Sequence, residues 1–369
     1  MQKYQRLENG LLYVELDGRQ GYYELGRQNG EVFKELIAEN ISKMRRLYCE
    51  NCTPEQLDQI LADIRGSRYI ADLQKYAPGL YDEIRGIADG SGASFEDIMM
   101  LNYLEEVPNA LPSGKCTATS LTGRANLPNM IFQNMDFTDA YHGFEAVYKI
   151  RFADKSILMY GFVGQFGGIG LNSKGLGDTI NVICNSPSNK GFGLPSTAIL
   201  RMILEQDTIE DCEKLLKSVP ASTAGCYMIT DSKSTVVFEV SANNIERIDP
   251  DERGFLVHTN HAIKTKDVCD VPGSFRGAEP IYDENGKTDF QTFERYALMT
   301  ELMSKEYQTF DAKDAMRILC TPPVNAKGLM CGLELLTLQS MIAVCDPKDP
   351  HMFVSQGNDV NRKFAELHF

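Results

Sequence analysis

One cysteine stands at a point in the chain where it could act as a nucleophile. Cys116 follows a stretch rich in helix and strand breakers, VPNALPSG (residues 107–114), and opens the strand-like segment TATSLT. A thiol needs a base and a lowered pKa to react. If the chain is cut between Lys115 and Cys116, the new α-amino group, which titrates near ~7.7–8, supplies that base. Position alone leaves two interpretations open: a buried inert thiol, or a nucleophile released by self-cleavage.

His258 and His261 offer a different way to activate Cys116. Residues three apart in a strand point to opposite faces, so these two imidazoles cannot share one metal ion. We therefore predict no metal site at these histidines. A conventional Cys–His thiol hydrolase, in which one of them activates Cys116 without self-cleavage, is an alternative. Cys49 and Cys52 form a C-x-x-C without a second pair at zinc-site spacing. We interpret most of the ten cysteines as buried thiols.

The elements that must position Cys116 fall into two groups. Residues 1–115 open with a strand-like GLLYVELDG and then show helical periodicity, including one long amphipathic helix over 23–48. Start signals predict three more helices, at Thr53–Pro54 with Gln56 as a capping box, at Pro78, and at Ser94 with Asp97. We therefore expect a mainly helical N-terminal segment, 1–115, that ends at the breaker-rich stretch.

Residues 116–369 have the pattern of a sheet-rich core. Short segments rich in β-branched and aromatic residues follow one another in hairpins, which predicts mainly antiparallel sheets. Two helical stretches, about 197–219 and 290–319, interrupt the strands. Such helices cover the outer faces of sheets, so we expect an α+β fold.

Composition narrows the choice of partners. The 369-residue chain carries 37 Lys and Arg against 51 Asp and Glu, a formal charge of −14. Phosphate backbones and anionic lipids would be repelled, so we expect neither nucleic acid nor membrane as a partner. No window has the length and apolarity of a signal peptide or a membrane helix, which predicts a cytoplasmic protein. The glycine run GQFGGIGLNSKGLG lacks the G-K-[ST] ending of a phosphate loop. The class of partner that remains is a small-molecule substrate.

Six motifs occur in an order and spacing that resemble one enzyme family. They are GYYELGRQNG (21–30), EIRGIADGSG (83–92) followed by DIMMLN, KCTATS (115–120), QNMDF (133–137), GLNSKGLGDTIN (170–181) and HTNH (258–261). The sequence resembles the acyl-coenzyme A:6-aminopenicillanic acid acyltransferase-like N-terminal-nucleophile hydrolases, which are more distantly related to the choloylglycine hydrolases. The family often has glycine before the cysteine, where this chain has Lys115.

The resemblance implies catalytic roles for three residues: Cys116 as nucleophile, Asp136 as its hydrogen-bonding partner and Asn260 as an oxyanion-hole donor. Physical chemistry is compatible with each role. A carboxylate on the strand that pairs with TATSLT can accept a hydrogen bond beside the thiol. An amide N–H can stabilise an oxyanion without adding charge.

Four further residues are candidates on weaker grounds. Gln133, Asn134 and Asn181 lie where the family has polar pocket residues, which implies substrate binding. Arg295 lies near an arginine of the relatives, but Thr292 replaces the serine of their Ser-x-x-Arg. A solvated helix arginine is an equal alternative for Arg295.

The resemblance also implies a fold and a reaction. The fold is the four-layer αββα sandwich of N-terminal-nucleophile hydrolases, in which 1–115 stays bound after cleavage as a small subunit and 116–369 is the catalytic core. The reaction is attack of Cys116 on a linear amide or an acyl thioester, followed by acyl transfer to water or an amine, without a cofactor. A non-catalytic binding protein on the same fold is a second alternative, and a homo-oligomer stays open.

Overall fold

Two large sheets lie face to face in the computed structural model, which describes residues 3–107, 115–286, 291–322, 324, 327–330 and 333–369. The first has nine strands, in spatial order β1 (Gln5–Arg6), β2 (Leu12–Asp17), β5 (Glu145–Arg151), β6 (Ser156–Phe162), β7 (Ile169–Asn172), β8 (Gly177–Val182), β9 (Gly225–Thr230), β10 (Thr235–Val240) and β11 (Ile245–Ile248). The second has seven, β12 (Phe255–His258), β3 (Lys115–Leu121), β4 (Met130–Thr138), β16 (Leu333–Val344), β17 (His351–Gln356) and β18 (Ala365–His368), with β15 (Lys327–Met330) beside β16. A small third sheet joins β13 (Phe275–Arg276) and β14 (Glu279–Pro280).

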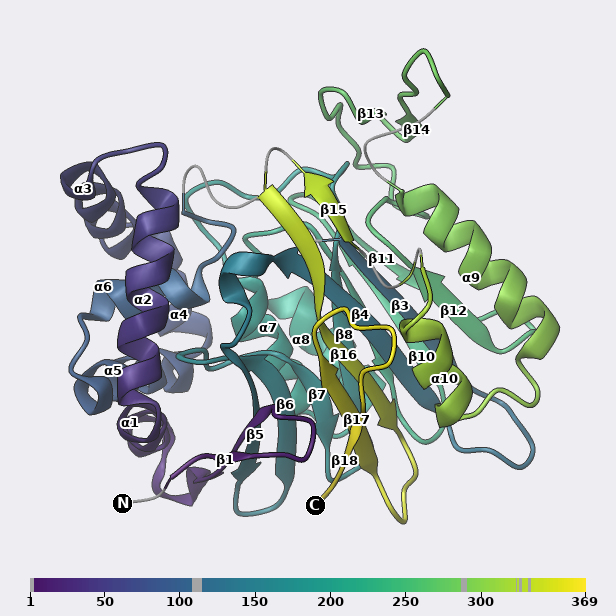
Figure 1. The fold of residues 1–369 in the computed structure, drawn as a ribbon, viewed down its shortest axis with the longest axis horizontal. Coiled ribbons are helices and arrows are strands. Elements are labelled where there is room, and N and C mark those ends of the chain that lie inside the picture. The colour runs from purple at the N-terminus through teal and green to yellow at the C-terminus, as the bar shows by residue number, and fades with distance from the viewer. Residues whose placement is uncertain (1–2, 108–114, 287–290, 323, 325–326, 331–332) are drawn as a thin grey trace.

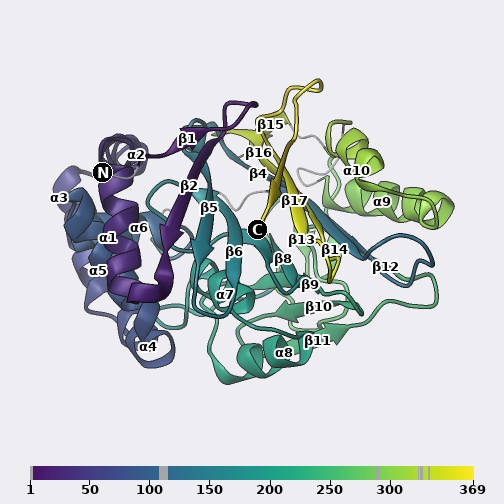
Figure 2. The ribbon, with the colours of Figure 1, turned by 90° about the horizontal axis from the view of Figure 1, so that it is seen from below.

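Ten α-helices accompany these strands in the described part of the chain. They are α1 (Tyr22–Val32), α2 (Lys34–Tyr48), α3 (Pro54–Arg65), α4 (Arg68–Tyr76), α5 (Pro78–Ser91), α6 (Phe95–Asn102), α7 (Ser196–Leu204), α8 (Ile209–Ser218), α9 (Thr292–Glu306) and α10 (Ala312–Leu319). Helices α1–α6 gather at one end of the molecule, and α9 and α10 lie at the opposite end (Figures 1 and 2). None of the described helices is long and apolar enough to cross a bilayer.

The sheets and helices form four layers. Helices α7 and α8 pack on the nine-stranded sheet, and α9 and α10 pack on the seven-stranded one. Between them, β3 and β4 face β8 and β9, so the main core lies between the two sheets. The predicted αββα sandwich is confirmed.

Strand pairing is antiparallel between the neighbouring strands of both sheets except at one place. There β2 pairs in parallel with β5, from Leu12 opposite Ala146 to Asp17 opposite Arg151. The N-terminal segment is therefore helical only in part, because β1 and β2 form the edge of the nine-stranded sheet. Its predicted boundary stretch, residues 108–114, lies outside the described residues.

Helix start signals were predicted correctly, but helix lengths were not. The capping box at Thr53 and Gln56 is present, and Ser94 is the N-cap of α6, where its side chain accepts from the Asp97 N–H. The expected single helix over 23–48 is two helices, because the chain turns at Phe33, whose ring is fully buried. The two later helical stretches are likewise two helices each, and α4 was not predicted.

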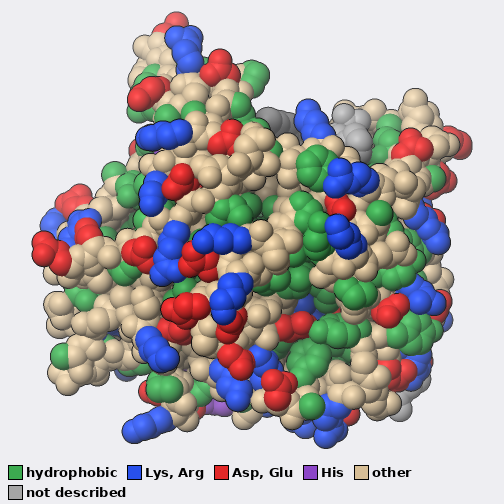
Figure 3. Space-filling model, turned by 180° about the vertical axis from the view of Figure 1, so that it is seen from behind, with side chains coloured by type: hydrophobic (Ala, Val, Ile, Leu, Met, Phe, Trp, Pro, Cys, Tyr) green, Lys and Arg blue, Asp and Glu red, His purple; other side chains and the backbone are tan. Residues whose placement is uncertain are grey.

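Charged side chains of both signs mix over the surface. On the face seen in Figure 3, Lys and Arg lie among Asp and Glu. Many form exposed ion pairs such as Arg253–Asp251. Exposed pairs of this kind contribute little to stability, about 0–1 kcal/mol each.

Glycines let α1 and α5 approach closely. A Cβ at Gly26 would collide with the backbone carbonyl of Glu83, and a Cβ at Gly86 would collide with that of Tyr23. A Cβ at Gly30 or at Gly90 would likewise collide with backbone atoms of the facing helix. The glycine spacing of GYYELGRQNG and EIRGIADGSG is thus explained by helix packing, because only a glycine leaves room for the facing backbone.

We expect Gly86→Ala to destabilise the protein. Overpacking a close helix contact costs about 1–3 kcal/mol, more than the ~0.8–1 kcal/mol gained in helix propensity. Gly66→Ala is the matched control, because Gly66 has an ordinary φ of −80° and its nearest atom to an added Cβ is 3.6 Å away. Urea unfolding should show a loss for Gly86→Ala and no loss for Gly66→Ala. Equal stability of the two variants would contradict the packing argument.

Candidate active site

Cys116 is the second residue of β3 and lies between the two sheets. It pairs with Met135 of β4, and only 5% of its surface is exposed. Its backbone N–H donates to Asn260 Oδ1 at 2.9 Å. Burial raises the pKa of its thiol well above the ordinary range, and the negative charge of Asp136 adds to this, while Arg295 opposes it. In the uncut chain the thiol is therefore protonated.

Asp136 lies on β4 opposite Lys115, the residue before Cys116. It is fully buried, and Thr337 Oγ1 donates to its Oδ1 at 2.6 Å. Burial raises the pKa of Asp136 to about 6, against the opposing effects of Arg295 and of the Thr337 hydrogen bond. This register places Asp136 opposite the residue that precedes Cys116.

Asn260 follows β12 and is held by hydrogen bonds on several sides. Its backbone N–H donates to Thr292 Oγ1 at 2.8 Å, and its carbonyl accepts from the Cys184 N–H at 3.0 Å. Its side chain donates from Nδ2 to the Val182 carbonyl at 3.1 Å. Its side-chain orientation is therefore fixed relative to Cys116.

Arg295, which the sequence analysis left open, is part of the site. It lies on α9 with 1% exposure and donates to the Cys116 carbonyl, to Thr117 Oγ1 at 2.7 Å and to Asn260 Oδ1 at 2.8 Å. Thr292 lies three residues earlier on the same helix face and accepts from Asn260. The Thr-x-x-Arg spacing was the available signal, since a threonine hydroxyl can accept as a serine hydroxyl does.

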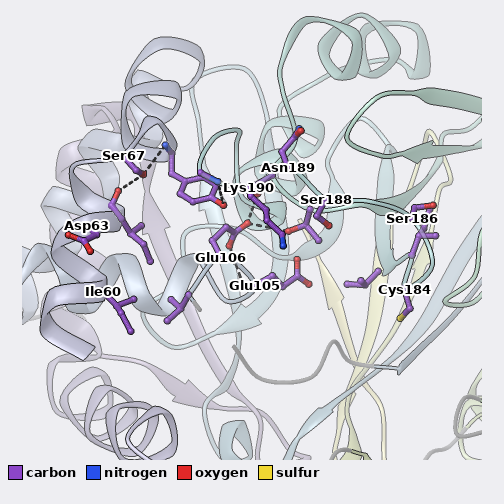
Figure 4. A pocket seen from close by; sticks show the side chains of 18 residues that line it. Ile60, Asp63, Ser67, Glu105, Glu106, Cys184, Ser186, Ser188, Asn189 and Lys190 are labelled. Atoms are coloured by element: carbon purple, nitrogen blue, oxygen red, sulfur yellow. Dashed lines mark hydrogen bonds between the residues drawn. The ribbon is translucent and has the colours of Figure 1, made fainter. Parts of the chain in front are cut away.

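Two neighbouring cavities share part of their lining, and one of them contains Cys116. A narrow one of about 80 Å³ contains Cys116 and is mainly apolar; its lining includes Met135, Phe137, Tyr160, Phe162, Ile169, Ile180 and Leu200. A wider one of about 700 Å³ lies between the N-terminal helices and the segment from Cys184 to Gly191. Glu105 and Val182 line both. Figure 4 shows Glu105 and Glu106 in the wider cavity.

The three residues expected to bind substrate have other contacts. Asn134 lies on the face of β4 toward α10, where its Nδ2 donates to the Leu319 carbonyl at 2.7 Å. Gln133 donates to the Ile180 carbonyl, and Asn181 donates to the His258 carbonyl at 3.3 Å. The described lining of the narrow cavity includes none of Gln133, Asn134 and Asn181. Side chains alternate along a strand, so Asn134 lies on the opposite face of β4 from Met135, which pairs with Cys116. Substrate binding by Gln133, Asn134 and Asn181 stays a prediction.

Neither histidine of HTNH has a hydrogen bond to Cys116 among the described residues. His258 is fully buried, with Nε2 2.9 Å from Glu239 Oε1 and Nδ1 2.9 Å from the Thr259 carbonyl. His261 Nδ1 lies 2.9 Å from Thr292 Oγ1. Their contacts hold the segment that carries Asn260.

Comparison with known proteins identifies the family. Residues 126–322 match the sequence profile of the family described as acyl-coenzyme A:6-aminopenicillanic acid acyl-transferase. The chain belongs to this family. The match includes Asp136, Asn260 and Arg295 and begins after Cys116. Membership confirms the enzyme class expected from the sequence, an acyltransferase or amidohydrolase.

A relative and two solved structures illustrate the range of similarity. The chain is 26% identical over 246 residues to the acyl-coenzyme A:6-aminopenicillanic-acid-acyltransferase 40 kDa form of Emericella nidulans, covering 65% of this chain and 67% of that one. A variant of the conjugated bile acid hydrolase from Clostridium perfringens matches with TM-score 0.46 and 16% identity, covering 68% of this chain and 92% of that one. Penicillin V acylase from Agrobacterium tumefaciens matches with TM-score 0.39 and 12% identity, covering 69% and 86%.

Glu239 is a buried carboxylate that the sequence analysis missed. Besides His258, it accepts from the backbone N–H groups of Ile263, Lys264 and Thr265, at 2.6, 2.9 and 2.7 Å. Burial raises its pKa, but these hydrogen bonds and His258 prevail and lower the pKa to about 2. A carboxylate on β10 of one sheet thus anchors the segment after β12 of the other.

We expect Glu239→Gln to reduce stability by about 1–3 kcal/mol near neutral pH, the value of a hydrogen bond to a charged group. The folded pKa of Glu239 lies below its unfolded value of ~4.3, so its contribution is present above about pH 4.3 and is lost as the pH falls toward about 2. Urea unfolding at several pH values should show the gap between wild type and variant closing over that range. A gap independent of pH would contradict this assignment. Glu246→Gln, on the neighbouring β11, is the control, with an expected change within about 0.5 kcal/mol.

Proposed function

We propose that the protein is an autoproteolytic cysteine N-terminal-nucleophile amidohydrolase or acyltransferase that forms a thioester on Cys116. The observation that carries the proposal is the pairing of Lys115 with Asp136, together with the hydrogen bond from the Cys116 N–H to Asn260. The bond to be cut and the groups that would use the new amine therefore lie together. Arg295 contacts the same unit.

Self-cleavage would begin with attack of Cys116 Sγ on the carbonyl carbon of Lys115. The peptide C–N bond breaks, the nitrogen takes the thiol proton, and a thioester links Lys115 to the sulfur. Water then hydrolyses this thioester, which releases the carboxylate of Lys115 and restores the thiol. The result is a Cys116 with a free α-amino group and two non-covalently joined chains, 1–115 and 116–369.

In turnover the α-amino group of Cys116 would act as the base. It accepts the thiol proton while Sγ attacks the acyl carbonyl, and it passes the proton to the leaving group. Asp136 holds the amine, and Asn260 Nδ2 stabilises the oxyanion, a contribution of ~10²–10³ in rate for one donor. Water or an amine then attacks the thioester and releases the acyl group. The chemistry uses only side chains and the α-amino group of this chain.

The two cavities support a division of the substrate into halves. The narrow apolar cavity at Cys116 suits the acyl group, since its lining is mainly aliphatic and aromatic. The wider cavity suits the leaving amine or the acceptor, and Glu105 lies where the two meet. Burial raises the pKa of Glu105 to about 7, and the neighbouring Glu106 adds to this. Amides of an apolar acid are thus the favoured substrate class.

The alternatives have less support. A Cys–His hydrolase needs an imidazole at the thiol, whereas His258 is paired with Glu239. A non-catalytic binding protein leaves the arrangement of Cys116, Asp136 and Asn260 without explanation. Division at residue 115 and a cytoplasmic location stay predictions.

Self-cleavage should be visible on a denaturing gel. We expect a 115-residue piece and a larger piece whose N-terminal sequence is CTATS, since Cys116 is the attacking group. Cys116→Ala should leave one intact chain. Cys184→Ala is the matched control, because the backbone N–H of Cys184 donates to the Asn260 carbonyl while its thiol takes no part in the proposed attack. A wild-type chain that stays intact after long incubation would contradict the proposal.

Substitution of Asn260 separates the two enzyme mechanisms. Asn260→Ala should lower kcat and kcat/KM together by ~10²–10³, because the oxyanion contact strengthens only in the transition state. His258→Gln should retain most activity per folded molecule, and the rate should follow an amine-like pKa of ~7.7–8 rather than an imidazole-like ~6.5. Thermal melting must first show that both variants fold. A folded but inactive His258→Gln beside an active Asn260→Ala would support the Cys–His mechanism instead.

A further inference from the structure

Two histidines face each other at the end of the seven-stranded sheet, among residues that the reaction does not use. His351 of β17 pairs with His368 of β18, and their rings stack with centroids 5.3 Å apart. Asp349, in the turn between β16 and β17, contacts both: Oδ1 lies 3.2 Å from His368 Nδ1, and Oδ2 lies 3.8 Å from His351 Nδ1. One donor atom from each of the three lies within 4.8 Å of the other two.

We propose that Asp349, His351 and His368 form a binding site for a divalent transition-metal ion of the Zn²⁺ type. Imidazole nitrogens and a carboxylate oxygen are ligands that such ions prefer, whereas Mg²⁺ and Ca²⁺ prefer oxygen alone. Two donors on one tetrahedral zinc lie about 3.3 Å apart when metal–nitrogen bonds are ~2.0–2.1 Å. The 3.2 Å between Asp349 and His368 matches this spacing.

Outer contacts already orient the imidazoles. Glu366 Oε1 lies 3.2 Å from His368 Nε2, so this carboxylate can hold a proton on Nε2 and leave Nδ1 for the metal. The backbone carbonyl of Asp349 lies 2.8 Å from His351 Nδ1 and can hold a proton there. Lys149 donates to the His368 carbonyl at 3.1 Å and fixes the strand from the other sheet. A metal-ligating histidine commonly has such a partner on its second nitrogen.

The site would act as a cross-link. A metal ion bound to Asp349 and His368 joins the turn after β16 to β18, two segments otherwise held by strand pairing and side-chain contacts. Because the ion binds the folded arrangement, it stabilises the protein by mass action. The proposal concerns stability and is independent of the reaction, for which we expect no metal.

Zn²⁺ titration of the purified full chain tests the site. We expect wild type to bind one more Zn²⁺ than His351→Ala or His368→Ala in calorimetry, and its melting temperature to rise with Zn²⁺ but not with Mg²⁺. Glu366→Gln should bind about 10- to 100-fold more weakly, the usual effect of losing an outer partner. All variants retain the ten cysteines, so differences between them do not reflect thiol binding.

His142→Ala is the matched control. His142 is half-exposed and lies 3.1 Å from a carboxylate oxygen of Glu145, and no second histidine contacts it among the described residues. It should bind Zn²⁺ as wild type does. Equal Zn²⁺ binding by wild type, His351→Ala and His368→Ala would overturn the proposal, as would a melting shift that Mg²⁺ reproduces. Unchanged melting of the variants without metal would show that they fold.

Discussion

One buried guanidinium, that of Arg295, fixes the geometry of the site. It binds the Cys116 carbonyl and Asn260 Oδ1, two groups that are far apart in the sequence. Asn260 Oδ1 accepts from Arg295 and from the Cys116 N–H, and these two hydrogen bonds fix the orientation of the side-chain amide. Its Nδ2 therefore points to the carbonyl of Val182, a residue that lines the cavities. Burial lowers the pKa of Arg295, and the negative charge of Asp136 opposes this. A buried charge is tolerable when it is paired and hydrogen-bonded in this way.

Hydrogen bonds between the two sheets, here called the joint, also hold Asn260 in position relative to Cys116. Cys116 lies on the seven-stranded sheet, while Glu239 of the nine-stranded sheet holds the segment that follows β12. Gln133 and Asn181 add hydrogen bonds across the same joint. Because interiors are close-packed, a shift at this joint moves Asn260 relative to Cys116. Gln133 of the QNMDF motif and Asn181 of the GLNSKGLGDTIN motif are therefore explained by these contacts between the sheets.

The N-terminal segment is built into the core rather than attached to it. Its β2 pairs in parallel with β5, and the glycines of α1 and α5 allow a close contact between the two helices. These contacts do not depend on the bond between Lys115 and Cys116. Strand pairing and buried apolar surface hold the segment against the rest of the core.

The sequence pattern by itself determined the mainly antiparallel strands and the helix caps. Periodicity and breakers are local, so they indicated the antiparallel strands, the cap at Thr53 and the strand that contains Cys116. Only the tertiary structure decided which side chains meet. Asn134 differs from its neighbour Met135 by one position, yet strand alternation turns it toward α10. Contacts between segments far apart in the chain, such as those of Arg295 and of His351 with His368, depend on packing that no local pattern records.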